Sequence, residues 1–238
     1  MPVFRQLTTK DVALTVCFTA LYAVLASIPI FQILGMPNRS ITAAAVVAPI
    51  IGVLLGPYVG VLSTALGGTI GFFNGSFSPP SFVSGVVTAL CAGLLYKGKR
   101  IWCAMVYLLF LAVFSFYPYI GPAWLFPPSM WFQIVGFIIL VSPLQTMATQ
   151  NLKSDNNARF FFAFFIVFLV ATLAGQISGS LTFMLISPVP ADGWLVLWQG
   201  LTFLYPVERI IIGLASALIS APLLKVLRKS NLESLTAK

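Results

Sequence analysis

Histidine is absent from this chain of 238 residues, and only five residues are Asp or Glu. Without histidine the protein lacks ligands for the usual catalytic zinc sites and for histidine-bound haem, and it lacks the base of Ser-His or Cys-His nucleophile pairs. The few carboxylates form no pair or cluster in any loop. We therefore expect no enzyme activity and no cofactor.

Cysteine is scarce too. The three that occur, Cys17, Cys91 and Cys103, stand in apolar runs without CxxC spacing. This pattern is typical of small buried hydrophobic residues. It indicates neither a disulfide framework nor a metal site.

Charged residues make up only 8% of the chain, whereas a soluble domain carries about 25%. The chain is 59% hydrophobic, with a mean hydropathy of +1.01. Such a chain has too little polar surface for water, so the composition predicts an all-α, polytopic integral membrane helical bundle, surrounded by lipid in the cell membrane. The net charge of +8 would suggest nucleic acid in a soluble protein, but for a membrane protein we expect no such partner.

Eight apolar runs, separated by polar or helix-breaking residues, divide the chain. The Gly56-Pro57 pair separates the second run from the third. We expect one membrane domain over residues 1–238 with six to eight transmembrane helices, because two of the runs could form a re-entrant hairpin. The predicted helices cover about residues 12–34, 41–55, 58–73, 81–96, 101–116, 130–148, 159–186 and 200–228.

The basic residues predict the orientation of these helices. With both termini cytoplasmic, all of the 13 Lys and Arg residues except Arg39 and Arg209 fall on inner segments. Such an asymmetry is the positive-inside signal of membrane proteins. The inner residues are Arg5, Lys10, Lys97, Lys99, Arg100, Lys153, Arg159, Lys225, Arg228, Lys229 and Lys238.

The last apolar run carries charge inside it. Glu208 and Arg209 stand side by side between Trp194 and Lys229. A charge in the hydrocarbon core costs several kcal/mol unless it faces protein or water, so both are functional candidates. Adjacent residues project about 100° apart on a helix, so the two cannot face one partner equally. We expect Glu208 to face inward.

Other polar and aromatic residues fall at the same outer level in this topology. Aromatic walls with a few directional polar groups are typical of a small-molecule pocket. The alternative is that the charged pair lies at a helix end and the tryptophans form an interfacial belt. The predicted substrate-binding residues are Asn38, Arg39, Asn74, Gln133, Gln176, Trp198, Tyr205 and Glu208.

Small residues recur every four positions along the second and third runs. They are Ala44, Ala48, Gly52, Gly56, Gly60, Thr64 and Gly68. Such a face lets helices approach closely, either within the bundle or in docking a partner's helix. The first helix has a similar face, which makes Thr15, Thr19, Ala23 and Ser27 candidate partner-binding residues.

Three stretches carry recognisable motifs: Leu7–Leu14 running into Ala20–Leu25, Ala48–Pro57 before a glycine-rich helix, and Ala221–Lys229. They resemble the substrate-binding S component of energy-coupling factor (ECF) vitamin transporters. The resemblance implies a bundle that captures a vitamin-like molecule from outside. It also implies docking, through the first helix, onto a coupling (T) subunit with two cytoplasmic ATPases. The pocket would involve the loop after the first helix, here Asn38-Arg39-Ser40.

The leading hypothesis is thus a substrate-capturing subunit for uptake of a vitamin or similar micronutrient, energised by partners because the chain has no nucleotide motif of its own. One alternative is a stand-alone secondary transporter or channel in which Glu208 carries a proton. Another is a structural subunit of a larger membrane complex.

Overall fold

The structure is a computed structural model that describes residues 9–35 and 38–229. In that part of the chain it forms nine α-helices, one short 3-10 helix and one antiparallel two-stranded sheet. In chain order they are α1 Thr9–Leu25, β1 Pro29–Gln32, β2 Ser40–Thr42, α2 Ala44–Phe73, α3 Pro79–Tyr96, α4 Arg100–Ser115, α5 Pro122–Leu125, η1 Pro127–Met130, α6 Trp131–Val141, α7 Pro143–Asn151, α8 Asn157–Ile186 and α9 Ala191–Lys229.

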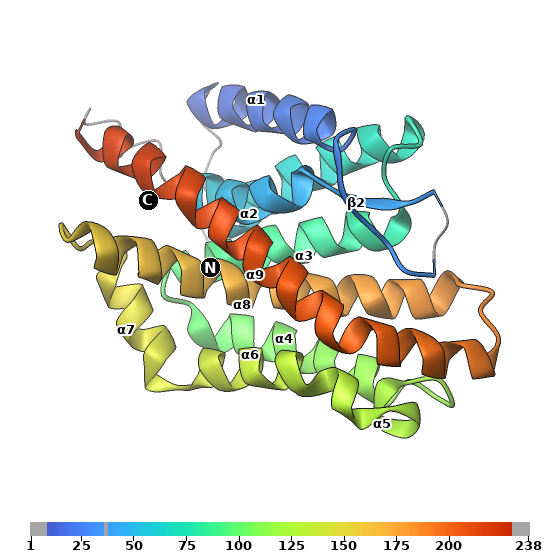
Figure 1. The fold of residues 1–238 in the computed structure, drawn as a ribbon. Helices are drawn as coiled ribbons and strands as arrows, with labels where there is room; N and C mark the ends of the chain where they lie inside the picture. Colours follow the sequence, from blue (N-terminus) through green and yellow to red (C-terminus); the bar gives the residue numbers. More distant parts are fainter. Residues whose placement is uncertain (1–8, 36–37, 230–238) are drawn as a thin grey trace, which may run out of the picture.

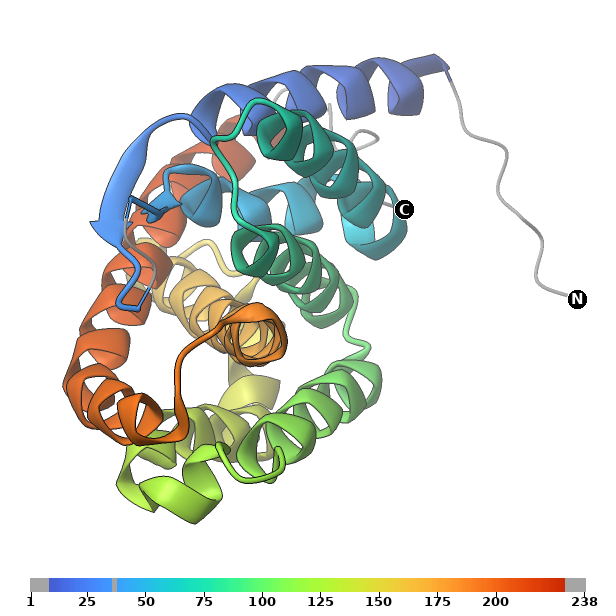
Figure 2. The same cartoon turned by 90° about the vertical axis from the view of Figure 1, so that its right-hand side faces the viewer.

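Helix α8 lies at the centre of the bundle. It packs against α3, α4, α6, α7 and α9, and the end-on view of Figure 2 shows it enclosed by its neighbours. Every residue from Val167 to Leu181 is buried. A helix that is hydrophobic all round is expected in such a position. α8 therefore forms the core on which the other helices pack.

Several helices suit a membrane. By length and composition, α2, α3, α8 and α9 are long and apolar enough to cross one among the described residues, and α6 with α7 would make a fifth if the bent pair is one span. Large apolar side chains cover the outside of the bundle, for example Ile101 at 74% and Phe203 at 76% exposed. Exposed apolar surface of this extent is typical of a lipid-facing protein.

The first predicted helix, 12–34, ends earlier than the sequence suggested. α1 stops at Leu25, and the chain then forms a hairpin in which Pro29 pairs with Thr42 and Gln32 with Ser40. Pro29 disfavours a helix here because it lacks the amide hydrogen and its ring crowds the preceding turn. The hairpin caps one end of the bundle (Figure 1).

The break predicted at Gly56-Pro57 is present. Gly56 has φ +79° within α2, a conformation that glycine adopts without strain. A Cβ on Gly60 would lie 3.0 Å from the Cα of Gly52, although eight residues of straight helix span about 12 Å. The two halves of α2 are therefore folded back on each other, as two of the predicted runs required, so α2 is long enough for a membrane by residue count but is not one straight span.

Two further boundaries differ from the prediction. The sixth run is broken at Ser142 into α6 and α7, which are bent by 65°, because Pro143 starts a new helix and Ser142 caps it. α9 begins at Ala191, well before the predicted residue 200, and its Pro206 and Pro222 do not end it.

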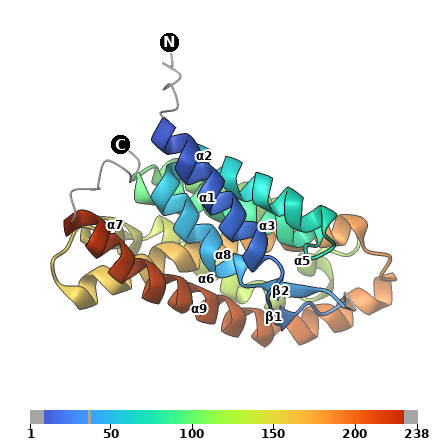
Figure 3. The same ribbon diagram turned by 90° about the horizontal axis from the view of Figure 1, so that it is seen from above.

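The bundle has two chemically different ends. The start of α1, the α3–α4 turn, the α7–α8 loop and the end of α9 lie together at what we call the basic end (Figures 1 and 3). Its described basic side chains are Lys97, Lys99, Arg100, Lys153, Arg159 and Lys225. Arg5 and Lys238, and the side chains of Lys10, Arg228 and Lys229, lie outside the described residues. The opposite end consists of the hairpin, the α2–α3 loop and the α8–α9 loop. We call it the cavity end, because a cavity opens near it.

Candidate functional site

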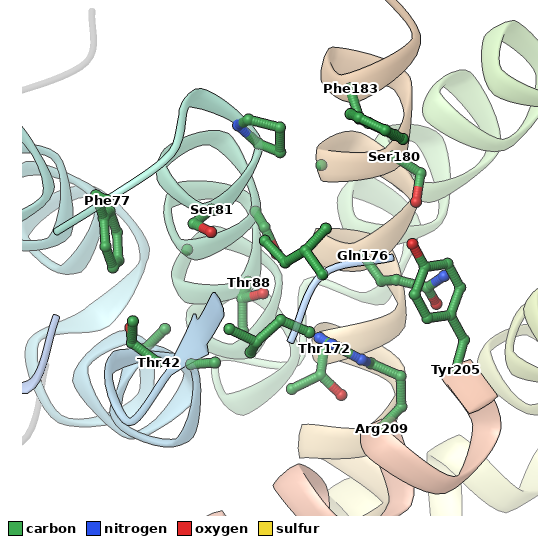
Figure 4. A pocket seen from close by; sticks show the side chains of 18 of the residues that line it. Thr42, Phe77, Ser81, Thr88, Thr172, Gln176, Ser180, Phe183, Tyr205 and Arg209 are labelled. Carbon is green, nitrogen blue, oxygen red and sulfur yellow. The ribbon is translucent and has the colours of Figure 1, made fainter. Parts of the chain in front are cut away.

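A cavity opens between the hairpin and the helices near the cavity end. Its lining comes from α1, the hairpin, the first half of α2, α3, α8 and α9. The side chains leave about 760 Å³ of unfilled space when the open mouth is counted. Figure 4 shows α3 and α8 as facing walls with α9 closing one side.

Close helix packing around glycine shapes these walls. A Cβ on Gly175 of α8 would lie 2.6 Å from the Ser84 carbonyl oxygen of α3, and one on Gly179 would lie 2.9 Å from the Pro80 carbonyl oxygen. Neither position can accept a larger residue unless the two helices separate. The spacing of the α3 and α8 walls is therefore set by glycine.

The lining is mainly apolar, with hydroxyl and amide groups set into it. Ile33, Ile41, Phe77 and Phe183 supply apolar surface. Arg209 is the one charged residue that lines the cavity in the described part of the chain. The polar lining residues are Gln32, Thr42, Ser81, Ser84, Thr88, Thr172, Gln176, Ser180, Tyr205 and Arg209.

Arg209 is held by α9 and is almost fully buried. Its side chain is 5% exposed, and Nη2 lies 3.4 Å from Oε2 of Glu208. Its Nε has no hydrogen-bond partner among the described residues. Glu208 is 2% exposed but does not line the cavity. Glu208 is therefore buried in the bundle, as is Arg209, but Arg209 is the one of the two that lines the cavity.

Comparison with known proteins gives no match. No family model, curated protein or solved structure matches this chain.

Gln176 and Gln133 form a second buried polar unit. In the orientation that satisfies both ends of its amide, Gln133 donates to the Ser129 and Met130 carbonyl oxygens and accepts from Gln176 Nε2 at 3.2 Å. This contact leaves Gln176 Oε1 without a partner among the described residues. Gln133 thus positions Gln176 from behind the wall instead of lining the cavity itself.

Three predicted residues lie beside the cavity instead of in its wall. Arg39 donates from Nη1 to the Gly75 carbonyl oxygen at 2.6 Å, which ties the hairpin to the α2–α3 loop. Asn38 is exposed with φ +63°, and Asn74 is the exposed C-cap of α2. None of the three lines the cavity.

Trp198 has a packing role. Its Nε1 donates to the Ile120 carbonyl oxygen at 2.9 Å. Its ring stacks on Trp194 and meets Phe114 edge-on. These contacts hold α9 against α4 and the segment before α5, away from the cavity lining.

Of the eight predicted site residues, Gln176 and Tyr205 line the cavity. The elements from α1 to α3 also supply lining residues that were not predicted from the sequence, among them Tyr22, Thr42 and Thr88. One signal was present: Ser81, Ser84 and Thr88 repeat at helical spacing within an apolar run.

The predicted partner face of α1 is occupied within the chain. Ser63 Oγ of α2 donates to the Thr15 carbonyl oxygen at 3.4 Å, and Thr19 Oγ1 donates to the Ser63 carbonyl oxygen at 3.3 Å. Ser27 and Ser76 share a hydrogen bond at 3.2 Å, and Ala23 is half-buried. Small residues on both helices bring α1 and α2 together, so Thr15 and Thr19 are packed inside the bundle.

The glycine face of α2 also packs within the bundle. A Cβ on Gly52 would overlap the Ala89 carbonyl oxygen of α3, and one on Gly67 would lie 2.7 Å from the Thr19 carbonyl oxygen of α1.

In the described part of the chain, no three His, Cys, Asp or Glu residues are grouped so that they could hold a metal ion.

Proposed function

We propose that this protein is a membrane-embedded subunit that captures a small molecule for uptake, a vitamin or similar micronutrient. The observation that carries the proposal is a cavity at one end of an apolar bundle with several polar groups in its lining. Three buried polar atoms in its lining, on Thr42, Gln176 and Arg209, lack partners among the described residues. Buried polar groups are normally hydrogen-bonded, so such a set needs a partner that enters the cavity, and a ligand with complementary groups can supply it.

The energy for uptake would come from partner proteins. The sequence carries no nucleotide-binding motif, and its resemblance to ECF S components supports a coupling T subunit and two cytoplasmic ATPases as partners. In this proposal the basic end and both termini face the cytosol, and the cavity opens outward across the cell membrane.

Docking onto such a coupling subunit would use a different face of α1 from the predicted one. Ala13, Cys17 and Ala20 are small and exposed, whereas Thr15 and Thr19 contact α2. An exposed face of small residues allows close approach of a partner helix.

The direct test is mass spectrometry of small molecules that co-purify with the protein, followed by equilibrium binding of any that are found. We expect a stoichiometric ligand whose affinity falls when Gln176→Ala removes a lining amide. A protein that co-purifies with nothing, and binds no member of a vitamin panel more tightly than about 1 mM, would contradict capture.

A stand-alone secondary transporter is the second candidate, because a buried Glu208–Arg209 pair adjoins the cavity. Intramembrane charged pairs of this kind are found in proton-coupled carriers. Proton-driven uptake by the purified protein alone in liposomes would favour this candidate over capture. A structural subunit would instead show failed complex assembly on deletion, with uptake intact.

A further inference from the structure

The guanidinium of Arg209 has hydrogen-bonding capacity that the protein does not use. A guanidinium has five N–H donors, and the one ion pair it forms among the described residues, to Glu208, is 3.4 Å long. Charge-assisted hydrogen bonds are typically about 2.7–2.9 Å. Glu208 is the preceding residue on the same helix, so it cannot offer both its oxygens to the fork of Arg209. Nε remains without a partner at a side-chain exposure of 5%.

Two other polar groups in the cavity lining, on Gln176 and Thr42, could bind a second part of the ligand. Gln176 Oε1 is an acceptor without a partner in the described part of the chain, and its amide is fixed by Gln133 from behind. Thr42 Oγ1, on β2, is buried and equally without a partner there. In the view of Figure 4 the amide of Gln176 on α8 lies beside the Tyr205 ring, and the guanidinium of Arg209 on α9 extends toward Thr172 and Thr88.

We propose that the captured molecule is a monocarboxylic acid whose carboxylate binds Arg209, and whose own hydrogen-bond donor meets Gln176. This inference rests on the proposed capture function and names the chemistry of its ligand. The planar fork of arginine matches a carboxylate through two parallel N–H donors, one of which is Nε–H. The apolar body of the acid would lie against Ile41 and Phe183.

The charge of the site favours a monoanion over a phosphate. Arg209 is the one cation among the described lining residues, and Glu208 already offsets part of its charge. A phosphate dianion would keep uncompensated negative charge in a buried site, which is costly. A carboxylate satisfies the same donors with one negative charge fewer than the dianion.

The experiment uses fragments that carry only the recognised group. The full-length protein in detergent is unfolded thermally with benzoate, with benzamide, or with chloride at matched ionic strength. Benzoate and benzamide have the same ring and differ in the charge of the head group. We expect benzoate to raise the unfolding temperature by a few degrees, as a ligand of the native state does, while benzamide and chloride have no such effect.

Two variants locate the effect. Arg209→Gln is expected to weaken benzoate binding by at least about tenfold, the scale of a lost hydrogen bond to a charged group. Arg159→Gln removes a charge at the exposed start of α8, at the basic end, and should bind benzoate as the wild type does. If Arg209→Gln does not fold, the double variant Glu208→Gln/Arg209→Gln removes the whole pair and serves the same purpose.

The results separate the carboxylate site at Arg209 from the proposed capture function. Equal stabilisation by benzamide and benzoate, or none by benzoate beyond that of chloride, overturns the carboxylate site. An undiminished benzoate effect in the Arg209→Gln variant does the same. A neutral molecule that co-purifies with the protein would also overturn this inference and leave capture standing.

Discussion

Glu208 and Arg209 are sequence neighbours, but they occupy different environments. Arg209 lines the cavity, whereas Glu208 is buried outside the lining and contacts the guanidinium at 3.4 Å. Removing one partner of a buried pair leaves the other charge uncompensated, which is more costly than removing both. Glu208 therefore acts on the cavity through Arg209.

This arrangement predicts the stability of Glu208→Gln. We expect the ligand-free variant to lose about 3–5 kcal/mol of stability, since Arg209 then stays charged without a carboxylate. The measurement is thermal or denaturant unfolding in detergent. The double variant Glu208→Gln/Arg209→Gln should recover most of this loss, and a single variant as stable as the wild type would show that the pair is not coupled.

A second residue-scale prediction concerns Gly175 at the α3–α8 contact. Gly175→Val should lower stability by about 1–3 kcal/mol through overpacking, and ligand affinity should fall with it as α3 moves. Gly200→Val is the matched control, because a Cβ there has no neighbour closer than Leu34 Cδ1 at 3.8 Å. Similar effects in both variants would mean that helix propensity, not the α3–α8 spacing, causes the loss.

At the scale of helices, the pattern of apolar runs predicted much of the fold. The turn at Gly56 lay where the helix-breaking pair predicted it, and α8 closely matches its predicted run. The hairpin after α1 was missed because residues 26–34 are as apolar as a helix. Hydropathy reports burial or lipid contact and does not distinguish a short strand from a helix.

The site was less predictable than the helices, because Ser and Thr hydroxyl groups in an apolar helix need not face a cavity. Thr172 Oγ1 and Ser178 Oγ each donate to a carbonyl oxygen of their own helix. Ser and Thr can satisfy themselves in this way anywhere in an apolar helix. Their presence therefore does not reveal which helix face lines a cavity. That face depends on how α3, α8 and α9 pack, which one sequence does not specify.

A third prediction concerns the exposed small residues of α1. If its exposed small face docks a coupling subunit, Ala20→Trp should cut recovery of ATPase subunits in affinity purification from the native host by about tenfold, as at an interface hot spot. Ligand binding should be unchanged, because Ala20 does not line the cavity. Leu109→Trp on the exposed face of α4 is the control. Full recovery with Ala20→Trp would remove this face from the proposal.

At the scale of the whole molecule, charge and cavity lie at opposite ends. The described lysines and the arginines Arg100 and Arg159 gather at the basic end, where Lys225 of α9 pairs with Asn157 of α8. Arg39 lies instead at the cavity end, held by the Gly75 carbonyl oxygen. Basic residues favour the cytoplasmic side during insertion. The same asymmetry that orients the bundle would then direct the cavity outward.

Site-directed labelling tests this orientation. In a Cys17→Ala background, Asn74→Cys places a thiol at the cavity end and Asp155→Cys places one at the basic end; both positions are exposed, while Cys91 and Cys103 are buried. A membrane-impermeant maleimide should label Asn74→Cys in intact cells and Asp155→Cys only after permeabilisation. The opposite pattern would place the cavity toward the cytosol, where a molecule could be released but not captured from outside. Labelling of both in intact cells would mean that the two loops do not lie on opposite sides of the membrane, and the bundle would then cross it differently from the proposed topology.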